Sequence, residues 1–385
     1  MIPYGRQQIS EEDIACVCET LRSDYLTQGS KPPLFEQAIC EVTGASFSVC
    51  VNSATSALHL ACLSLEVGSK DEVWVSPISF VASSNCALYC GASVKFIDID
   101  PITNNICPIK LEKNLKEYKL TNKPLPKVII AVHLAGLSCD MQAIGHLSKV
   151  YGFRVIEDAS HAIGACYLEK AVGCCDFSDI TIFSFHPVKI ITTGEGGAAV
   201  TNDKSIAEKM RLLRSHGVTR DENQLIENHG PWYYEQQLLG FNYRLTDIQA
   251  SLGLSQLNKL KSFIMQRRNI AKFYFEELAL LPIELPKKEA IDQSSWHLFI
   301  IKLNLSEIKK SHLQIFNELR DAGVSVNLHY MPIYLQPYYQ TLGYNNQYCE
   351  NADNYYRRAI SIPIYHGMNK EDQQTVVATL KRVLL

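Results

Sequence analysis

Residues 181–197 read Thr-Ile-Phe-Ser-Phe-His-Pro-Val-Lys-Ile-Ile-Thr-Thr-Gly-Glu-Gly-Gly. The β-prone run at 180–184 breaks at Pro187, and a second apolar run at 198–201 follows the glycines, so the stretch predicts two buried strands joined by a loop. Lys189 lies in that loop. Because an unpaired charge is costly away from water, its ammonium must stay solvated, find a partner or be bound covalently. An amine in a partly dry site loses basicity and suits Schiff-base chemistry, whereas a solvated surface lysine is the ordinary alternative.

Length and composition restrict the class of protein. The 385 residues suggest about two domains, and 46% apolar with 20% charged residues is ordinary for a soluble globular chain. A net charge of -3 gives no reason to expect nucleic acid or an acidic membrane as a partner, and no apolar run reaches the length of a membrane span. The chain has 13 cysteines, an odd number, and they are scattered along the sequence, so we expect reduced thiols and a cytoplasmic location. No Cys-x-x-Cys pairs occur among them, so we expect no metal site.

The order of the expected elements indicates an α/β fold. Short apolar strands alternate with helical stretches in the N-terminal part of the chain, and the strands are expected at 47–51, 72–76, 94–99, 127–133, 153–157, 180–184 and 198–202. Such alternation predicts a mostly parallel sheet covered by helices on both faces. Helical residues at 245–281 lead into a smaller α+β region, in which 296–301 and 324–328 are expected as strands. We therefore expect a large α/β domain at 1–250, and a linking helix with a small C-terminal domain at 251–385.

The stretch Asn52-Ser53-Ala54-Thr55-Ser56 lies between an expected strand and an expected helix. Free N–H groups at a helix start, together with neighbouring hydroxyls, form a site for a phosphate group. The alternative is that these hydroxyls only cap the helix. On the residues alone, both interpretations stay open.

Two more residues follow expected strands. Asp158 comes directly after the strand at 153–157, where ligands bind in open α/β sheets. Its carboxylate could hold a protonated pyridine nitrogen, as pyridoxal phosphate chemistry requires, or it could cap the next turn. Phe80 follows the strand at 72–76 and could stack on a flat ring, or it could belong to the core.

The sequence Gly194-Glu195-Gly196-Gly197-Ala198-Ala199 formally matches the fingerprint of dinucleotide-binding proteins. That motif must follow a strand and open a helix, whereas a strand is expected to follow it here, so a nicotinamide dehydrogenase is disfavoured. A phosphate anchor, a stacking ring, a carboxylate for the pyridine nitrogen and a Schiff-base lysine instead occur at strand ends. Together they predict pyridoxal 5'-phosphate as the cofactor.

Three stretches resemble the DegT/DnrJ/StrS family of nucleotide-sugar aminotransferases. They are the lysine loop at 184–197, the run Glu-Asp-Ala-Ser-His at 157–161, and Gly-Phe-Asn-Tyr-Arg-Leu-Thr-Asp-Ile-Gln-Ala at 240–250. The resemblance extends from Leu-Thr-Gln-Gly at 26–29 to His-Tyr-Met-Pro at 329–332 and Ile-Ser-Ile-Pro at 360–363. It implies a fold type I pyridoxal phosphate-dependent aminotransferase that forms a homodimer with active sites at the subunit interface.

Within the family, Ser-Phe-His-Pro-Val-Lys at 184–189 and Pro-Ile-Ser-Phe-Val-Ala at 77–82 are most similar to the transaminases of pseudaminic acid biosynthesis. This resemblance implies transfer of an amino group from L-glutamate to C4 of a UDP-linked 4-keto-6-deoxy-N-acetylhexosamine. The chain departs from many relatives at Ala54, where they carry glycine. A phosphate contact through the main-chain N–H survives that change.

The resemblance also assigns roles to residues at matching positions. The expected catalytic residues are Lys189, which would bind the cofactor as a Schiff base and move the proton, Asp158 at the pyridine nitrogen, and His161 near the ring oxygen. Phe80 takes the stacking position. Phosphate contacts map to Ala54, Thr55, Ser56 and Ser184, and to Asn242 reaching over from the partner subunit. The candidates for substrate binding are Thr27, Arg244 and His329, although Arg244 and His329 could instead be solvated or capping residues.

Competing interpretations concern the activity more than the fold. Some relatives are sugar dehydratases with histidine at the lysine position, and Lys189 argues against that activity. A catalytically silent regulatory homologue would keep the fold, but the set of Lys189, Asp158 and Ser184 disfavours it. An aminotransferase for another nucleotide-linked keto-sugar, aminated at C3 or with different stereochemistry, stays open.

Overall fold

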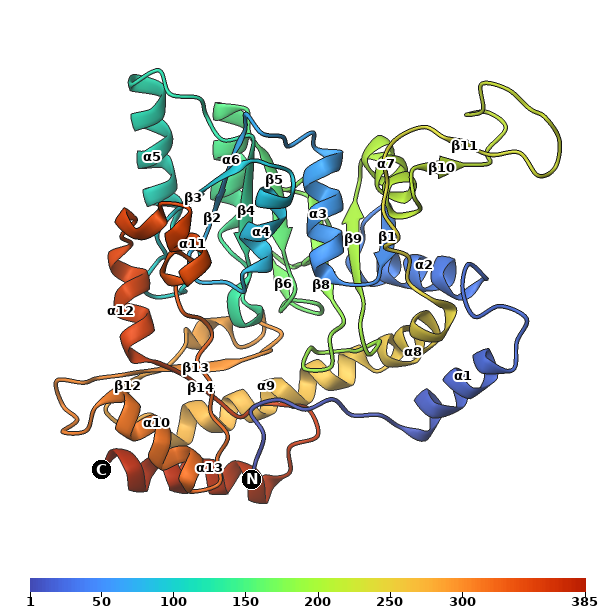
Figure 1. Cartoon of the computed structure of the whole chain (residues 1–385). Helices are drawn as coiled ribbons and strands as arrows, with labels where there is room; N and C mark the ends of the chain where they lie inside the picture. The colour runs from blue at the N-terminus through green and yellow to red at the C-terminus, as the bar shows by residue number, and fades with distance from the viewer.

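A seven-stranded sheet forms the centre of the protein (Figure 1). The computed structural model describes residues 1–385, except for the side chain of Asn345. The strands lie in the order β1-β9-β8-β5-β4-β2-β3. Their bounds are Phe47–Val51 (β1), Glu72–Val75 (β2), Ser93–Phe96 (β3), Val128–Val132 (β4), Arg154–Asp158 (β5), Ile180–Ser184 (β8) and Gly197–Thr201 (β9). Strands β3, β2, β4, β5 and β8 are parallel, and β9 runs antiparallel between β8 and β1, so the predicted mostly parallel α/β sheet is confirmed.

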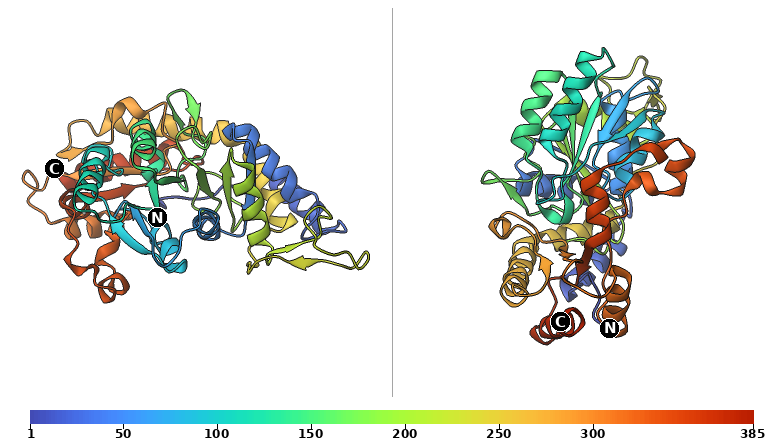
Figure 2. Two further views of the ribbon diagram at one scale, coloured as in Figure 1. Left: turned by 90° about the horizontal axis from the view of Figure 1, so that it is seen from above. Right: turned by 90° about the vertical axis from the view of Figure 1, so that its left-hand side faces the viewer.

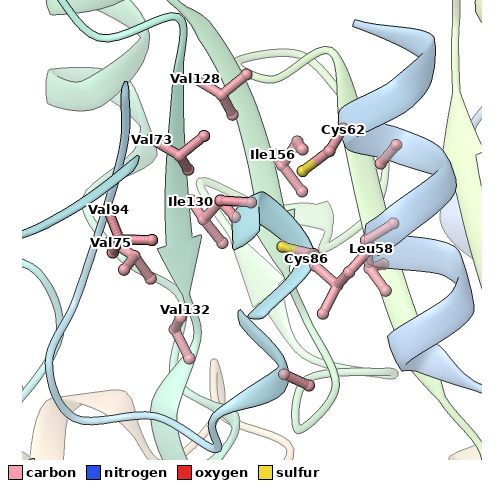
Figure 3. Packing of buried hydrophobic residues seen from close by; sticks show 14 of the residues in the cluster. Leu58, Cys62, Val73, Val75, Cys86, Val94, Val128, Ile130, Val132 and Ile156 are labelled. Atoms are coloured by element: carbon pink, nitrogen blue, oxygen red, sulfur yellow. The ribbon is translucent and has the colours of Figure 1, made fainter. Parts of the chain in front are cut away.

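Helices cover both faces of this sheet because its central strands carry apolar side chains on both sides. All five residues of β4 are buried. On one face, Val128 and Ile130 belong to a core shared with α3 (Ala54–Ser64), α4 (Ala82–Tyr89) and α7 (Lys204–Arg214), part of which Figure 3 shows. On the other face, Ile129 and Ala131 pack with α5 (Pro108–Leu120) and α6 (Met141–Tyr151).

The β1–β9–β8 side of the sheet is covered by the N-terminal helices and the first part of the linking segment. Helix α1 (Glu11–Leu21) begins at Ser10, which forms the expected capping interaction with Asp13. Helix α2 (Lys31–Thr43) and helix α8 (Asp247–Asn258) share a core with strands β8 and β9. The predicted helix at 245–281 is two helices, because the chain turns at Lys259 between α8 and α9 (Leu260–Glu277).

A second core lies below the sheet in the C-terminal part. Strands β12 (Ile283–Glu284), β13 (Phe299–Leu303) and β14 (Ala359–Ile362) form an antiparallel sheet, which packs with α9, α10 (His312–Asp321) and α13 (Lys370–Leu384). The predicted strand at 324–328 is wrong, because this segment makes only isolated bridges from Val324 to Ile2 and from Asn327 to Ser361. The expected domain boundary after residue 250 falls inside α8 and stays a prediction.

The remaining elements connect the two cores or extend from them. Helices α11 (Pro337–Thr341) and α12 (Glu350–Arg358) return to the core of the large sheet, to which they contribute Tyr339 and Tyr355. Strands β6 (Cys166–Tyr167) and β7 (Lys170–Ala171) form a short hairpin. Strands β10 (Val218–Thr219) and β11 (Glu235–Gln236) lie in a segment that projects from the body of the protein (Figures 1 and 2). In the described part of the chain, no helix combines the length and hydropathy that crossing a membrane requires.

Candidate active site

A cavity of about 830 Å³ opens at the carboxyl ends of the parallel strands, between the large sheet and the C-terminal part. Its size is suited to a cofactor together with a small substrate. Asp158 ends β5, Ser184 ends β8, and Ala54 starts the helix that follows β1, so the sheet topology alone brings these residues to one edge. The sequence-predicted residues that line the cavity are Ala54, Thr55, Phe80, Asp158, His161, Ser184, Lys189 and His329.

Lys189 occupies the loop between β8 and β9, as expected, and its main-chain N–H donates to the carbonyl of His186 at 2.9 Å. The residue is half-buried and lines the cavity. Burial lowers the pKa of Lys189 to about 8, and the opposing charge of Asp158 offsets only part of that effect. About a tenth of the amine is therefore neutral at pH 7, against less than about a thousandth for an ordinary lysine, and the neutral form is the one that a nucleophile or a base requires.

Asp158 is buried, with 6% of the residue exposed, and donors on two sides fix its carboxylate. Its Oδ2 accepts a hydrogen bond from Ser83 Oγ at 2.6 Å, and its Oδ1 accepts from Ser160 Oγ at 2.6 Å and from the Ser160 N–H at 3.1 Å. A carboxylate has about four acceptor sites, so these three donors leave capacity for one more. That remaining capacity, in a carboxylate that lines the cavity, fits a protonated ring nitrogen.

The start of α3 provides the features of a phosphate site. Ser53 caps the helix by accepting the Ser56 N–H at 3.1 Å, and helix geometry leaves the N–H groups of Ala54 and Thr55 without intrahelical partners. Gly197 lies so close that a Cβ there would be 2.5 Å from the Ala54 nitrogen, which explains why glycine starts β9. Ser56 does not line the cavity, since its hydroxyl donates to Asn52 Oδ1 at 2.6 Å, and its role as a phosphate contact stays a prediction.

Phe80 and His161 lie on the walls of the cavity. The Phe80 ring is 60% exposed, so it is available for stacking on a planar ligand and is not a core residue. His161 Nδ1 accepts a hydrogen bond from the Ala135 N–H at a distance of 3.3 Å. The ring hydrogen therefore lies on Nε2, which is 3.2 Å from the hydroxyl oxygen of Tyr330. Burial lowers the pKa of His161 well below its usual range, and the nearby Lys189 and His329 add to that effect, so this imidazole is neutral.

Three predicted residues lie away from the cavity of their own chain. Thr27 is exposed in the turn between α1 and α2, and Asn242 is exposed as well. Arg244 is half-buried, and its main chain forms a bridge with Val51. Within the described residues, none of the three contributes to the cavity lining, so their predicted roles depend on a second subunit.

The structure adds cavity residues that sequence patterns did not indicate. Ser83, which fixes Asp158, lies on the helix after Phe80, and Tyr330 contacts His161 across 169 positions of the sequence. His297 and Asn327 also line the cavity, and the rings of His297 and His161 are 4.3 Å apart. The stretch His-Tyr-Met-Pro at 329–332 was the one available signal, because the resemblance to the family included it and it contains Tyr330.

Comparisons with known proteins agree with this geometry. The model of the DegT/DnrJ/EryC1/StrS aminotransferase family matches residues 7–381. The chain is 38% identical to the UDP-4-amino-4,6-dideoxy-N-acetyl-beta-L-altrosamine transaminase of Campylobacter jejuni, over 100% of this chain and 98% of the relative. The structure of Helicobacter pylori PseC, an aminotransferase involved in the biosynthesis of pseudoaminic acid, superposes with a TM-score of 0.90 at 34% identity and covers 100% of this chain and 99% of PseC. The PLP-form of the putative sugar aminotransferase Spr1654 from Streptococcus pneumoniae has a TM-score of 0.87 at 30% identity, over 99% of this chain and 98% of the other. The chain therefore belongs to the DegT/DnrJ/EryC1/StrS aminotransferase family.

Proposed function

We propose that the protein transfers the amino group of L-glutamate to C4 of a UDP-linked 4-keto-6-deoxy-N-acetylhexosamine, with pyridoxal 5'-phosphate as cofactor. The observation that carries this proposal is the position of the weakly basic Lys189 amine in one cavity with the fixed carboxylate of Asp158. Two relatives named as transaminases of a UDP-4-amino-4,6-dideoxy sugar, 38% and 39% identical over the whole chain, support the choice of sugar. The free thiols of the chain support a cytoplasmic location.

Pyridoxal phosphate, when bound, supplies a carbon that carries the amino group between the two substrates and a ring that accepts electrons. In our proposal, the N–H groups of Ala54 and Thr55 and the hydroxyl of Ser184 hold its phosphate. Asp158 keeps the ring nitrogen protonated, Phe80 covers the ring, and the neutral His161 lies beside the ring oxygen. Each of these residues lines the cavity.

Lys189 performs the proton transfers in this proposal. Its Nζ would hold the cofactor covalently and would be free to act as a base once an amino substrate takes its place. The neutral amine then takes the proton from Cα of glutamate. In the reverse direction, it returns a proton to the sugar carbon that receives the nitrogen. The pKa of about 8 suits both directions, because a base whose pKa lies near the working pH can accept a proton and give it back.

We also propose that two copies of the chain share their active sites. Asn242 and the substrate-binding candidates Thr27 and Arg244 would then reach the cavity of the partner subunit, and His329 would bind substrate within its own chain. Large apolar side chains are exposed on the projecting β10–β11 segment and beside α1 and α2, where a second copy would cover them; they are Tyr25, Leu34, Ile226, Trp232 and Leu239.

Mixed subunits test this sharing. Lys189→Ala and Arg244→Ala, each inactive alone, should regain about a quarter of wild-type activity when the two proteins are mixed and reassociated, because half of the dimers then contain one intact site of two. A mixture that stays inactive would show that both residues serve the same chain. The same experiment with Thr27→Ala or Asn242→Ala places those residues in one subunit or the other.

The catalytic proposal is tested with purified protein, pyridoxal phosphate, L-glutamate and UDP-linked 4-keto-6-deoxy-N-acetylhexosamines of both C5 configurations. Mass spectrometry should detect the 4-amino sugar together with an equal amount of 2-oxoglutarate. If glutamate is converted but no sugar is aminated, the protein acts on a different keto-sugar. If neither reaction occurs, the protein is a silent homologue and the proposal fails.

A further inference from the structure

A buried carboxylate joins the turn between α1 and α2 to the start of α8. Asp247 is the first residue of α8, and it is only 1% exposed. Its Oδ2 accepts a hydrogen bond from the Gly29 N–H at 2.8 Å, and its Oδ1 accepts one from the Lys31 N–H at 3.0 Å. Its own N–H donates to the Leu26 carbonyl at 3.0 Å. These three bonds hold the turn beside the start of α8, although Gly29 and Asp247 are 218 positions apart (Figure 1).

The position of this carboxylate between two helix starts explains why the contact is strong. Asp247 follows the capping residue Thr246 of α8, and Lys31 is the first residue of α2. The first turn of a helix has unpaired N–H groups and favours a negative charge. Ser30 caps α2 without a side-chain hydrogen bond, so the Asp247 carboxylate supplies an acceptor to that helix as well. Hydrogen bonds to a charged acceptor are stronger than bonds between neutral groups.

A glycine at position 29 is a condition of this contact. A Cβ there would lie 2.6 Å from Asp247 Oδ1 and 2.6 Å from Tyr25 Cβ, which is closer than non-bonded atoms approach one another. Any larger residue would push the turn away from the carboxylate. The close approach therefore depends on a residue from each side, Gly29 in the turn and Asp247 in the helix.

The turn contains Thr27, which the family resemblance assigns to substrate binding and which lies away from the cavity of its own chain. Arg244, the second candidate of this kind, precedes Asp247 by three residues. The capping box of Thr246 and Gln249 fixes this helix start, and the Gln249 side chain also donates to the Glu195 carbonyl in the lysine loop at 2.8 Å. Thr27 and Arg244 are therefore both attached to the same fixed helix start.

The surroundings of Thr27 are those of an interface. Thr27 is exposed, and so are the apolar side chains of Tyr25, Leu26 and Leu34 around it. This is part of the surface that we propose a second copy of the chain covers. A turn of this kind must hold its shape when the partner binds, and the bonds to Asp247 provide that constraint.

We propose that Asp247 is a positioning residue that acts on the active site of the partner subunit, because it holds Thr27 against the sugar nucleotide bound there. This inference rests on the proposed function and on the proposed sharing of active sites. Asp247 contacts neither substrate nor cofactor in this arrangement and acts only through the turn. Its loss should therefore weaken the binding of the sugar, while Lys189 and Asp158 of the same chain keep their chemistry.

Hydrogen exchange of the purified full-length protein tests the anchor without any substrate. Asp247→Asn keeps the shape of the side chain but replaces one acceptor oxygen by an NH2 group, so one of the two bonds to main-chain N–H groups is lost. Peptides that cover residues 25–31 should exchange about ten times faster than in the wild type, whereas peptides from the large sheet should not change. Unchanged exchange in the turn would overturn the proposal.

Kinetics of the holoenzyme separate positioning from a general loss of structure. Asp247→Asn should raise KM for the UDP-linked keto-sugar about tenfold, because a contact to the bound sugar is lost. The rate at which L-glutamate converts the holoenzyme should stay within about twofold of wild type, since that step uses groups of the intact cavity. Gly29→Ala disturbs the same contact from the other side and should raise the same KM. Equal losses in the two half reactions would overturn the proposal.

Gly68 and Asp71 provide matched controls. The Gly68 N–H donates to Asp71 Oδ2 at 2.8 Å, which is the same type of contact, and the pair lies in the loop before β2, at the end of the strand opposite to the cavity. A Cβ at Gly68 would come no closer than 4.0 Å to its nearest neighbour, Asp71 Oδ2. Asp71→Asn and Gly68→Ala should therefore keep the wild-type KM for the keto-sugar. A tenfold higher KM in these controls as well would overturn the assignment to Asp247.

A mixed dimer shows which active site Asp247 serves. One Asp247→Asn chain and one Lys189→Ala chain, isolated together through a different affinity tag on each, form a dimer with one working cavity, and the partner of that cavity has an intact Asp247. The proposal predicts a wild-type KM for the keto-sugar in this dimer. A KM as high as that of Asp247→Asn alone would show that Asp247 acts on its own chain and would overturn the proposal.

Failure of this inference differs from failure of the proposed function. If the Lys189→Ala and Arg244→Ala mixture regains activity while the mixed dimer with Asp247→Asn keeps a raised KM, only the role of Asp247 is wrong. If the wild type aminates no keto-sugar, the proposed function fails and the role in sugar binding fails with it. Hydrogen exchange still measures the contact between Asp247 and the turn in that case.

Discussion

Glu157 and Asp158 are neighbours on β5, but their side chains point to opposite faces and meet opposite environments. Glu157 accepts hydrogen bonds from His133 at 2.7 Å, from Thr181 at 3.1 Å and from the Ser178 hydroxyl. It does not line the cavity of Lys189, and it borders a separate, smaller pocket of about 180 Å³. Asp158 accepts from two serines and faces the cavity together with Lys189. Both carboxylates are almost fully buried.

The difference shows how a buried charge can serve stability or function. Burial raises the pKa of Glu157, but its hydrogen bonds with His133, Ser178 and Thr181 outweigh that effect and leave the pKa lowered. Every strong donor near Glu157 comes from the chain itself, so this carboxylate is complete without a ligand. Asp158 retains acceptor capacity on the side of the cavity, which is the property of a binding group.

The largest effect on activity should come from removing the amine of Lys189 in the cavity. Lys189→Ala should lower turnover by about 10⁴-fold, because the variant loses both the covalent attachment point and the base. Steady-state kinetics with L-glutamate and the keto-sugar measure this loss. Lys204→Ala on the exposed start of α7 is the control and should keep wild-type rates. A Lys189→Ala protein within tenfold of wild type would contradict the assignment.

Deleting the two neighbouring carboxylates tests the comparison directly. Asp158→Ala should lower kcat by about 10²–10³-fold and change the free energy of unfolding little, since Ser83 and Ser160 can bond to water in the cavity. Glu157→Ala should destabilise the apoprotein by about 3–5 kcal/mol, because the buried His133 and Thr181, together with Ser178, lose the acceptor that they share. Urea unfolding and kinetics of both variants measure the two effects. Equal losses of stability in Asp158→Ala and Glu157→Ala would show that the two carboxylates contribute alike to folding, which would contradict the comparison.

A pH experiment tests whether the cavity keeps the Lys189 amine weakly basic. Below its pKa the ammonium cannot attack the aldehyde, so the rate at which apoprotein combines with pyridoxal phosphate should rise about tenfold per pH unit and level off above about pH 8. Stopped-flow absorbance between pH 6 and about 10 follows the reaction. Levelling only near pH 10, the region of an ordinary lysine, would show that burial does not act on this amine.

The smallest effect concerns the donor that orients Asp158. Ser83→Ala removes the 2.6 Å hydrogen bond to Oδ2, and a bond to a charged group of this kind corresponds to about tenfold in kcat/KM. Ser84→Ala is the matched control, because the adjacent hydroxyl bonds to Tyr339 and the Val81 carbonyl, away from Asp158. Equal kcat/KM values for the two variants would show that the hydrogen bond from Ser83 to Asp158 does not support the reaction.

The sequence predicted the strand-end half of the site because simple rules govern it. Central parallel strands are apolar runs, and ligands gather at their carboxyl ends. Asp158 and Ser184 are the last residues of such strands, and Lys189 lies in the loop that follows β8. The other half comes from Tyr330, His297 and Asn327, which reach the cavity through folding of the C-terminal part over more than a hundred residues. Local spacing carries no information about such contacts. The wrong strand prediction at 324–328 has the same cause. The segment has a sequence typical of a strand, but in the folded protein it pairs with other segments only through single bridges.

The absorption spectrum of the purified protein with pyridoxal phosphate, before and after L-glutamate, tests the central claim most directly. The wild type should show the visible band of the protein-bound cofactor, and glutamate should convert it to the spectrum of the pyridoxamine form. Lys189→Ala should fail to make that conversion at a comparable rate. A wild-type protein that shows no band after cofactor is added would contradict the account.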